Sequence, residues 1–354
     1  MPGLPLAVSS VALVTSSQVL AFLPLVLILL ANAAALPAAR PGLPPWWYWG
    51  LLAVVGVATA LLGLASAGSN AGYGVGLAAG GTAMASLALA PVRARVARFW
   101  PIERSSVLDA TALGFTFVIA ASQAGLQLGG NVLAQVASST AVSPSDLVLN
   151  ELPFLLAALL GVGIFMRRGP GAALTRLGLV RPRWWHVCLG LACAGGFYLF
   201  SLGADTVQQV LTPGTAARVG AATGKLYGGI GTPLGITTIA LAAGICEETL
   251  FRGALQPRLG IVWTAIVFAL VHTQYGISID ELAVLVLAFG LGGLRAATNT
   301  TTSMICHVAY NAITAAQLAA SALAWPGLAA EALLLAAVGA GIGLSRRSPD
   351  RTTG

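Results

Sequence analysis

The chain consists of one apolar run after another, each about as long as a membrane-spanning helix. The hydrocarbon core of a bilayer is about 30 Å thick, so a helix rising 1.5 Å per residue needs about 20 apolar residues to cross it. Inside lipid, only helices and closed barrels satisfy every backbone hydrogen-bonding group, and apolar runs of 18 or more residues are typical of helices. The sequence therefore predicts an all-α protein, a polytopic transmembrane helix bundle.

Apolar runs bounded by charged or turn residues indicate about eleven spans. Only 8% of the residues are charged and the mean hydropathy is +0.87, whereas soluble domains carry about 25% charged residues. Glycine, with 43 residues, and alanine are abundant inside the runs, and small residues allow transmembrane helices to pack closely. The expected spans are residues 13–36, 46–67, 71–91, 107–130, 147–166, 184–203, 233–253, 260–275, 282–298, 301–320 and 325–344.

Basic residues are concentrated in short segments between the apolar runs, at 93–104, at 167–183 and in the tail 346–351. The positive-inside rule places such segments in the cytoplasm. An even number of predicted spans separates each segment from the next, so all three fall on one side. We expect a multi-pass plasma-membrane protein with its N-terminus outside and its C-terminus in the cytoplasm. The net charge of +7 then reflects these basic segments, and we expect the lipid bilayer and no nucleic acid as a partner.

Three ionisable residues lie within six positions of the expected span 233–253. They are Glu247, Glu248 and Arg252. A charged side chain at the centre of a bilayer helix costs about 2.5–3.5 kcal/mol on insertion scales, so such groups usually mark a site. Glu248 and Arg252 are four residues apart and share one helical face, whereas Glu247 is rotated by about 100° from Glu248. We expect one carboxylate to be paired with the arginine and the other to be free to act.

Two further polar pairs follow on the next expected spans, each with helical i,i+4 spacing. They are Phe268 with His272 and His307 with Asn311. Only three histidines exist in the chain, and the third, His186, follows two tryptophans at an expected membrane interface. From the distances to the expected span ends, we expect a site in the cytoplasmic half of the membrane, open toward the cell interior.

Most other acids of the chain, including Asp109, Glu151 and Glu331, are expected at membrane interfaces.

The order EExxxR, FxxxH and HxxxN on consecutive membrane segments resembles the CAAX protease and bacteriocin-processing (CPBP) family of intramembrane endopeptidases. This family also includes bacterial proteins of the abortive-infection type. The resemblance covers about 145–345. The residues that match the family pattern are Glu247, Glu248, Arg252, Phe268, His272, His307 and Asn311.

The resemblance implies a glutamate-type endopeptidase that needs no metal or other cofactor and cleaves membrane-associated proteins or peptides. By family position, Glu247 acts with His272 to activate a water molecule, and His307 with Asn311 holds the developing oxyanion. A carboxylate in a medium of low dielectric constant is a competent general base. Preorganised donors in a water-excluded site stabilise an oxyanion, and losing one donor typically lowers the rate about 10²–10³-fold.

The family resemblance also implies that Glu248 and Arg252 orient the site. It also divides the chain into accessory N-terminal transmembrane helices at 1–140, a CPBP-type protease core at 141–345 and a cytoplasmic tail at 346–354. Seventeen arginines against one lysine, with heavy use of alanine and glycine, point to a GC-rich bacterial gene. The substrate is expected to be a membrane-associated protein or peptide, and its identity is left open.

Three alternatives remain at the level of sequence. Glutamate and histidine are also zinc ligands, so a zinc-dependent membrane hydrolase is the nearest rival, although no HExxH motif is present. Intramembrane carboxylates and histidines also relay protons in transporters, but the chain shows no internal repeat of the kind that many carriers have. A membrane scaffold without catalytic activity is the third alternative.

Overall fold

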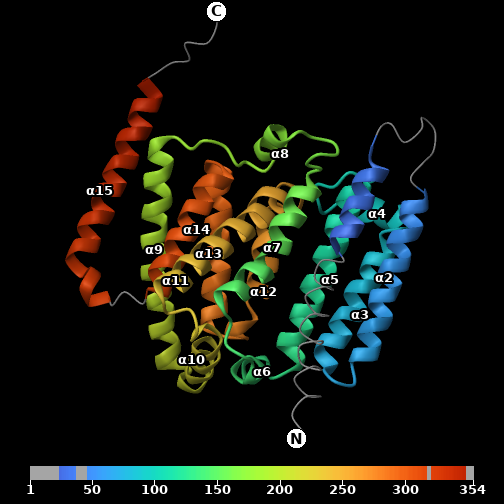
Figure 1. The fold of residues 1–354 in the computed structure, drawn as a ribbon, viewed down its shortest axis with the longest axis horizontal. Coiled ribbons are helices and arrows are strands. Elements are labelled where there is room, and N and C mark those ends of the chain that lie inside the picture. Colours follow the sequence, from blue (N-terminus) through green and yellow to red (C-terminus); the bar gives the residue numbers. More distant parts are fainter. Residues whose placement is uncertain (1–23, 37–45, 317–319, 348–354) are drawn as a thin grey trace, which may run out of the picture.

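The computed structural model describes residues 24–36, 46–316 and 320–347. Apart from one β-bridge between Ile164 and Arg168, the regular structure in these ranges is helical, as predicted (Figure 1). A helix at Pro24–Ala34 precedes α2. The others are α2 Trp46–Ser66, α3 Ala71–Ser86, α4 Ala90–Val96, α5 Val107–Gly129, α6 Val132–Ser138, α7 Pro144–Gly161, α8 Pro170–Arg176, α9 Trp184–Leu211, α10 Pro213–Tyr227, α11 Pro233–Glu248, the π-helix η1 Thr249–Leu255, α12 Gln256–Leu270, the 3₁₀-helix η2 Thr273–Tyr275, α13 Ile279–Ala297, α14 Thr300–Ala315 and α15 Ala320–Arg347.

Fewer helices than expected have the length and composition of a membrane span. Five described stretches qualify, and a sixth qualifies if α3 and α4, bent by 106°, are counted as one. The prediction of about eleven spans is therefore not supported. α14 has only 16 residues, α13 carries three charged residues, and residues 13–23 of the first expected span lie outside the described ranges. The five stretches are Trp46–Ser66, Val107–Gly129, Pro144–Gly161, Trp184–Leu211 and Pro233–Leu270.

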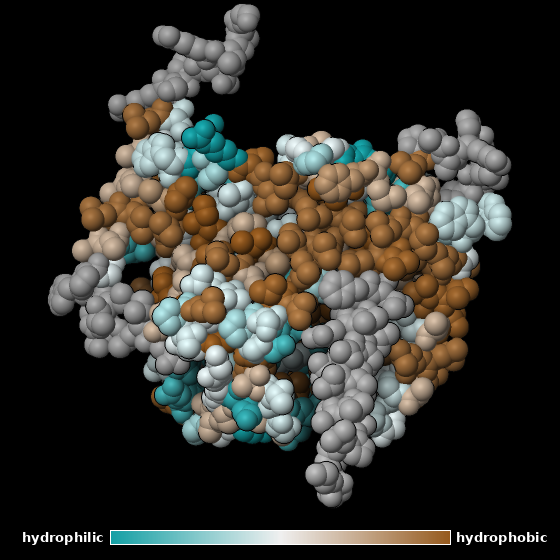
Figure 2. All heavy atoms as spheres, viewed as in Figure 1, coloured by the Kyte–Doolittle hydropathy of each residue, from teal (hydrophilic) through white to brown (hydrophobic). Residues whose placement is uncertain are grey.

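The surface agrees with an integral membrane protein. Figure 2 shows apolar side chains in a broad band across the middle of the molecule, with hydrophilic side chains gathered toward the two ends. Within the N-terminal part, α3 packs between α2 and α5 through glycine, as the abundance of small residues predicts. A methyl group on Gly76 would overlap the backbone of Ala121 in α5, and one on Gly63 would overlap the backbone of Ala78.

The chain reverses its direction at Gly260, inside the helical stretch Pro233–Leu270. Gly260 has φ 76° and ψ 172°, a conformation that glycine adopts readily and other residues avoid. A straight helix would separate Arg252 from Phe268 by about 24 Å at 1.5 Å per residue. Instead, the guanidinium carbon of Arg252 lies 4.3 Å from the centre of the Phe268 ring. The stretch is therefore a helical hairpin, with α11 and η1 in one arm and most of α12 in the other.

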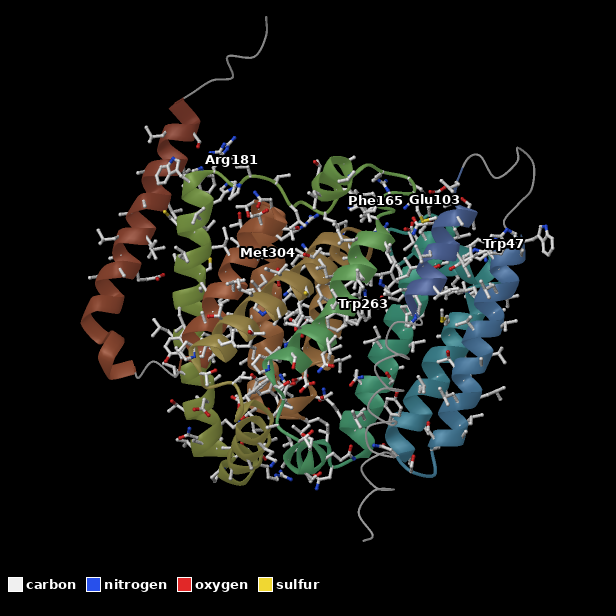
Figure 3. All side chains as sticks on the ribbon, in the orientation of Figure 1. Trp47, Glu103, Phe165, Arg181, Trp263 and Met304 are labelled. Atoms are coloured by element: carbon white, nitrogen blue, oxygen red, sulfur yellow. The ribbon has the colours of Figure 1, made fainter. Side chains whose placement is uncertain are left out.

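The two ends of the molecule differ in charge. The end that contains α4 and α8 carries most of the basic residues, and Figure 3 shows Glu103, Phe165 and Arg181 together at this end. We call it the basic end; α6 and α10 lie at the opposite end, and the C-terminal end of α15 lies on the side of α8 (Figure 1). The basic segments thus share one side, as predicted. The residues that define the basic end are Arg93, Arg95, Arg98, Arg104, Arg167, Arg168, Arg176, Arg181 and Arg183.

Candidate active site

Glu247 and Glu248 end α11, directly before the π-helix Thr249–Leu255. π-turns are rare and occur often at functional sites. Both acids are buried, with 7% of Glu247 and none of Glu248 exposed. Oε2 of Glu247 forms no hydrogen bond with the described part of the chain. The structure therefore holds one carboxylate group deep in the protein with an acceptor atom that is not engaged.

Glu248 forms an ion pair with Arg252, as the i,i+4 spacing predicted. Oε2 of Glu248 and Nε of Arg252 are 3.6 Å apart, and both side chains are completely buried. The guanidinium group also lies over the Phe268 ring and donates to the carbonyl oxygen of Ala288 over 3.5 Å. Breaking a buried ion pair leaves an uncompensated charge, so this pair fixes the end of α11 against α12 and α13.

His272 lies just beyond α12, where a span over 260–275 had been expected. The helix ends at Leu270, and His272 precedes the 3₁₀-helix Thr273–Tyr275. Its Nδ1 is 2.7 Å from the carbonyl oxygen of Phe268. A carbonyl oxygen only accepts, so Nδ1 carries a proton, and in the tautomer with that proton alone Nε2 is an acceptor. Nε2 lies 4.0 Å from Oε2 of Glu247.

His307 comes from α14 and contacts both glutamates. Its Nδ1 is 3.1 Å from Oε1 of Glu248, and its Nε2 is 4.0 Å from Oε2 of Glu247. The ring stands edge-on to Phe268, with the two centroids 5.9 Å apart. Glu247 therefore faces two imidazole nitrogens at the same distance, each too far for a direct hydrogen bond.

Asn311 lies one turn after His307 and borders the same cavity. This cavity has a volume of about 1160 Å³ and is lined by Glu247, His272, His307 and Asn311 together. Four residues that the sequence places on three separate segments thus surround one space. Glu248 and Arg252 lie behind this layer and hold it through His307 and Phe268.

Glu151 had been expected at a membrane interface, and the structure corrects this. It comes from α7 and lines the cavity together with Glu247, and its Oε2 is buried without a hydrogen bond from the described residues. Tyr227 and Tyr275 also line the cavity. Burial is the main cause that raises the pKa of both phenols, so they remain neutral hydrogen-bonding groups. The only sequence signal for these three residues was the position of Glu151, an acid within the apolar run 147–166.

The cavity opens toward the end opposite to the basic end. Its walls include α10, the segment 228–231, the start of α13 and the last turns of α14, and α10 lies at the far end from α8 (Figure 1). The sequence had placed the site and the basic segments on the same side of the membrane. The side of the membrane that the cavity faces stays a prediction.

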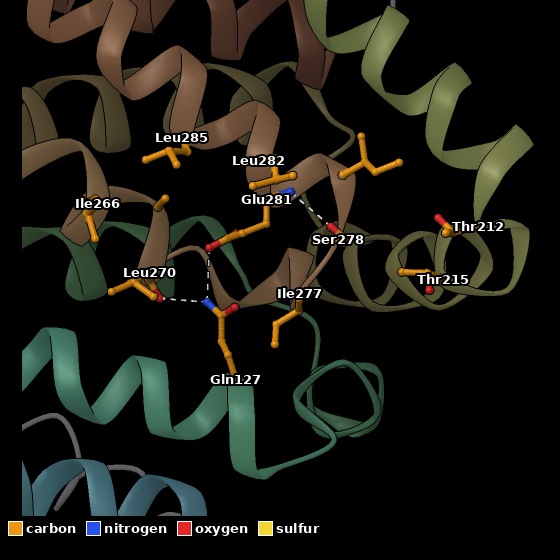
Figure 4. A pocket seen from close by; sticks show the side chains of 12 residues that line it. Gln127, Thr212, Thr215, Ile266, Leu270, Ile277, Ser278, Glu281, Leu282 and Leu285 are labelled. Carbon is orange, nitrogen blue, oxygen red and sulfur yellow. Dashed lines mark hydrogen bonds between the residues drawn. The ribbon is translucent and has the colours of Figure 1, made fainter. Parts of the chain in front are cut away.

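A second, smaller cavity of about 440 Å³ lies between α5, α10, α12 and α13 (Figure 4). There, Nε2 of Gln127 donates to the carbonyl oxygen of Leu270 and to Oε1 of Glu281, each over 3.2 Å. This contact joins the N-terminal helices to the end of α12, close to His272. It belongs to the framework of the site rather than to its reacting groups.

Among the described residues, no three histidine, cysteine, aspartate or glutamate side chains are arranged so that they could hold a metal ion. The cysteines Cys188, Cys193, Cys246 and Cys306 are free thiols.

Comparison with known proteins gives one match. Residues 229–313 match a sequence model of the family described as type II CAAX prenyl endopeptidase, Rce1-like. No curated protein and no solved structure matches the chain significantly. The matched segment runs from the start of α11 to α14. It contains all six candidate site residues, and it is narrower than the expected protease core at 141–345.

Proposed function

We propose that the chain is a glutamate-type intramembrane endopeptidase, on the premise that residues 229–313 match the model of the Rce1-like type II CAAX prenyl endopeptidase family, a family of proteases. Its substrates are peptide bonds of membrane-associated proteins or peptides. The buried Glu247, Glu248 and His307 cluster is consistent with such an active site. The distance of 4.0 Å between Glu247 and His272 is the observation that carries the mechanism.

That distance suits a water molecule held between two acceptors. Oε2 of Glu247 is a carboxylate oxygen, and Nε2 of His272 is an acceptor because Nδ1 donates to Phe268. A water donates one hydrogen to each and is left with a lone pair for attack. General-base assistance of this kind contributes about 10²–10⁴-fold to a rate.

Hydrolysis then follows with all atoms accounted for. The water oxygen bonds to the carbonyl carbon of the substrate while its proton passes to Glu247. The carbonyl oxygen becomes an oxyanion, which Asn311 and Nε2 of His307 stabilise. Glu247 returns the proton to the leaving nitrogen, the carbon–nitrogen bond breaks, and a carboxylic acid and an amine result.

The role of His307 as an oxyanion donor sets a condition on its charge. Nδ1 donates to Glu248, so donation from Nε2 as well requires a proton on both ring nitrogens. The buried carboxylate of Glu248 holds the His307 ring, and Arg252 holds Glu248 in place. These two residues therefore act as positioning residues.

The lining of the cavity supports a division of the chain into a core and an accessory part. Every lining residue falls between Leu147 and Ala315, inside the proposed core at 141–345. The helices before residue 140 contact this core at several places, among them the Gln127 hydrogen bonds of α5 and the packing of α6 against α10. We assign residues 1–140 to an accessory unit that supports the hairpin at Gly260.

For the orientation, the arginine-rich basic end belongs in the cytoplasm by the positive-inside rule. The cavity then opens on the outer side of the plasma membrane. Arg181→Cys at the basic end and Arg218→Cys on α10, in a chain without its native cysteines, test this in intact cells. A membrane-impermeant maleimide should label Arg218→Cys directly and Arg181→Cys only after permeabilisation. The reverse pattern would contradict the assignment.

The test of the activity compares wild type with Glu247→Gln in detergent, using Glu103→Gln as a matched control. Glu103 is exposed at the basic end, far from the cavity. We expect peptide cleavage by wild type and by the control, and none by Glu247→Gln at the same expression and melting temperature. Cleavage by Glu247→Gln at the wild-type rate would remove Glu247 from the mechanism. Membrane peptides that accumulate only with Glu247→Gln would identify the substrate.

A further inference from the structure

Five arginines from four segments of the chain come together beside α8, at the basic end of the molecule (Figure 1). All five are half-buried, whereas Arg98 and Arg181, in the loops of the same end, are exposed. We call the five residues the arginine cluster. They are Arg167 and Arg168 after α7, Arg176 at the end of α8, Arg258 near the start of α12 and Arg295 in the last turn of α13.

The apolar packing of α8 places two members of the cluster next to this helix. Leu177, at the end of α8, belongs to one buried apolar group with Val162 and Ala254. Nη1 of Arg168 donates to the carbonyl oxygen of Val162 over 2.6 Å, and Nη1 of Arg258 donates to that of Ala254 over 2.8 Å. Both guanidinium groups are therefore fixed to the backbone on which α8 packs.

The positive charge of the cluster is largely uncompensated. Among the described residues, its one ion pair joins Nε of Arg258 to Oδ1 of Asp109 over 2.9 Å. Burial and then the positive charges of Arg258, Arg168 and Arg295 lower the pKa of Arg176, while the charge of Asp109 raises it. Salt screens partly buried charges less than exposed ones. Five cations beside one carboxylate therefore leave room for a further anion.

The cluster also contains buried donors without an acceptor. Nη2 of Arg167 and Nε of Arg295 are buried and form no hydrogen bond with the described part of the chain. The side chain of Arg176 has no hydrogen-bond or ion-pair partner among the described residues either. Buried polar groups are nearly always satisfied in native proteins, so each exception needs an explanation.

The positive-inside rule explains how many arginines this end carries, but not how they are placed. Arginines that only fix the orientation of a chain can extend into water one by one, as the exposed Arg98 and Arg181 do. The arginine cluster instead combines four segments, partial burial and donors that lack an acceptor.

We propose that the arginine cluster is a binding site for a phosphate group, carried either by the headgroup of an anionic lipid or by a small soluble phosphate compound. A phosphate offers several acceptor oxygens, and the planar guanidinium group binds such oxygens in pairs. Basic pockets between helices at a membrane surface bind the headgroups of anionic lipids. The site lies at the end opposite to the mouth of the catalytic cavity and does not depend on the proposed protease activity.

Melting of the purified, delipidated full-length protein in a nonionic detergent tests the site. Short-chain phosphatidylglycerol, short-chain phosphatidylcholine, inorganic phosphate and pyrophosphate are added separately at constant ionic strength. We expect a saturable rise in the melting temperature with an anionic probe and none with phosphatidylcholine, because a ligand of the folded state stabilises it. The anionic probe that saturates at the lowest concentration identifies the source of the phosphate group. No saturable rise with any anionic probe would overturn the proposal.

Paired variants distinguish a specific site from general attraction to a basic surface. Arg176→Gln with Arg295→Gln removes two charges of the cluster, and Arg98→Gln with Arg181→Gln removes two exposed charges as the matched control. We expect the half-saturating concentration to rise at least about tenfold in the cluster variant, because charge-assisted hydrogen bonds are lost. It should stay near the wild-type value in the control. Equal increases in both variants would overturn the site.

The single variants Arg176→Gln and Arg295→Gln should change stability in opposite directions with and without the ligand. Without an added anion, each removes repulsion within the cluster, so its melting temperature should equal or exceed that of wild type. At an anion concentration that saturates the wild type, the wild type should be the more stable protein. Lower melting temperatures of both variants under both conditions would indicate a purely structural role and overturn the proposal.

Discussion

Nδ1 of His307 lies 3.1 Å from Oε1 of Glu248. Glu248 is adjacent to the proposed base, Glu247, and it holds the His307 ring that faces this base. Glu248 also pairs with Arg252, and Arg252 lies over the Phe268 ring. One buried carboxylate thereby connects α11, α12 and α14. The positions of Glu247, His272 and His307 depend on one another through it, and this dependence can be measured.

Removal of either member of the buried pair should reduce stability as well as activity. Glu248→Ala or Arg252→Ala leaves an unpaired charge in the protein interior, which typically destabilises by about 3–5 kcal/mol. The double variant should be less destabilised than the sum of the two single variants, because neither charge is then left alone. Folding yield and melting temperature in detergent provide the measurement. Wild-type yields for both single variants would show that the pair is not a structural clamp.

Asn311→Ala should lower kcat about 10²–10³-fold with little change in KM or melting temperature, as expected for an oxyanion donor. Asn150→Ala is the matched control, since Asn150 lines the same cavity but is exposed on α7. It should leave kcat close to wild type. A loss of stability in Asn311→Ala, with kcat intact, would point to a helix-packing role instead.

His272 should carry a proton on Nδ1, because the Phe268 carbonyl oxygen only accepts. Nitrogen NMR of the protein labelled in histidine distinguishes this tautomer from the Nε2-protonated form. His272→Gln, used to assign the signal, should also lose most of the activity. An Nε2-protonated ring would exclude the proposed water contact.

Gly260→Ala should destabilise the helical hairpin through the backbone alone. No atom lies within 4 Å of a Cβ placed there, but φ is 76° and ψ is 172°, a conformation essentially confined to glycine that costs another residue about 1–3 kcal/mol. Gly293→Ala on α13 is the control, with equal space and ordinary helical geometry. We expect a lower melting temperature and lower activity only for Gly260→Ala. Equal effects of the two substitutions would contradict the role of the turn.

Strong chelators should leave the activity unchanged if Glu247 and His272 activate the water without a metal. Peptide cleavage after exhaustive chelation is the measurement, with and without added zinc. Loss of activity that zinc restores would favour the metal-dependent alternative.

Local spacing made the centre of the site predictable from sequence. Glu248 with Arg252 is an i,i+4 pair that a helix must bring together, and the structure confirms it. Convergence with His272 and His307 was expected from a family resemblance rather than from periodicity. Glu151 was misplaced because an acid near the end of an apolar run has the same local pattern at an interface and in a cavity. Only the packing of α7 against α11 distinguishes the two.

The side on which the cavity opens depends on tertiary structure in the same way. Distances along single helices do not show that α10 folds across the end of the bundle and forms a wall of the site. The expected number of spans is not supported because it gave every apolar run its own crossing, while only five or six described stretches qualify by length and composition. Several runs instead form short or charged helices, such as α13 and α14.

Because of the π-helix Thr249–Leu255, the geometry of the site depends on the number of residues in this segment. Its backbone hydrogen bonds join residues five apart instead of four, so deletion of one residue would allow the segment to close as an ordinary α-helix. That change would rotate Glu247 and Glu248 by about 100° relative to the following arm of the hairpin. Insertions or deletions between Glu248 and Gly260 are therefore incompatible with the arrangement of the site.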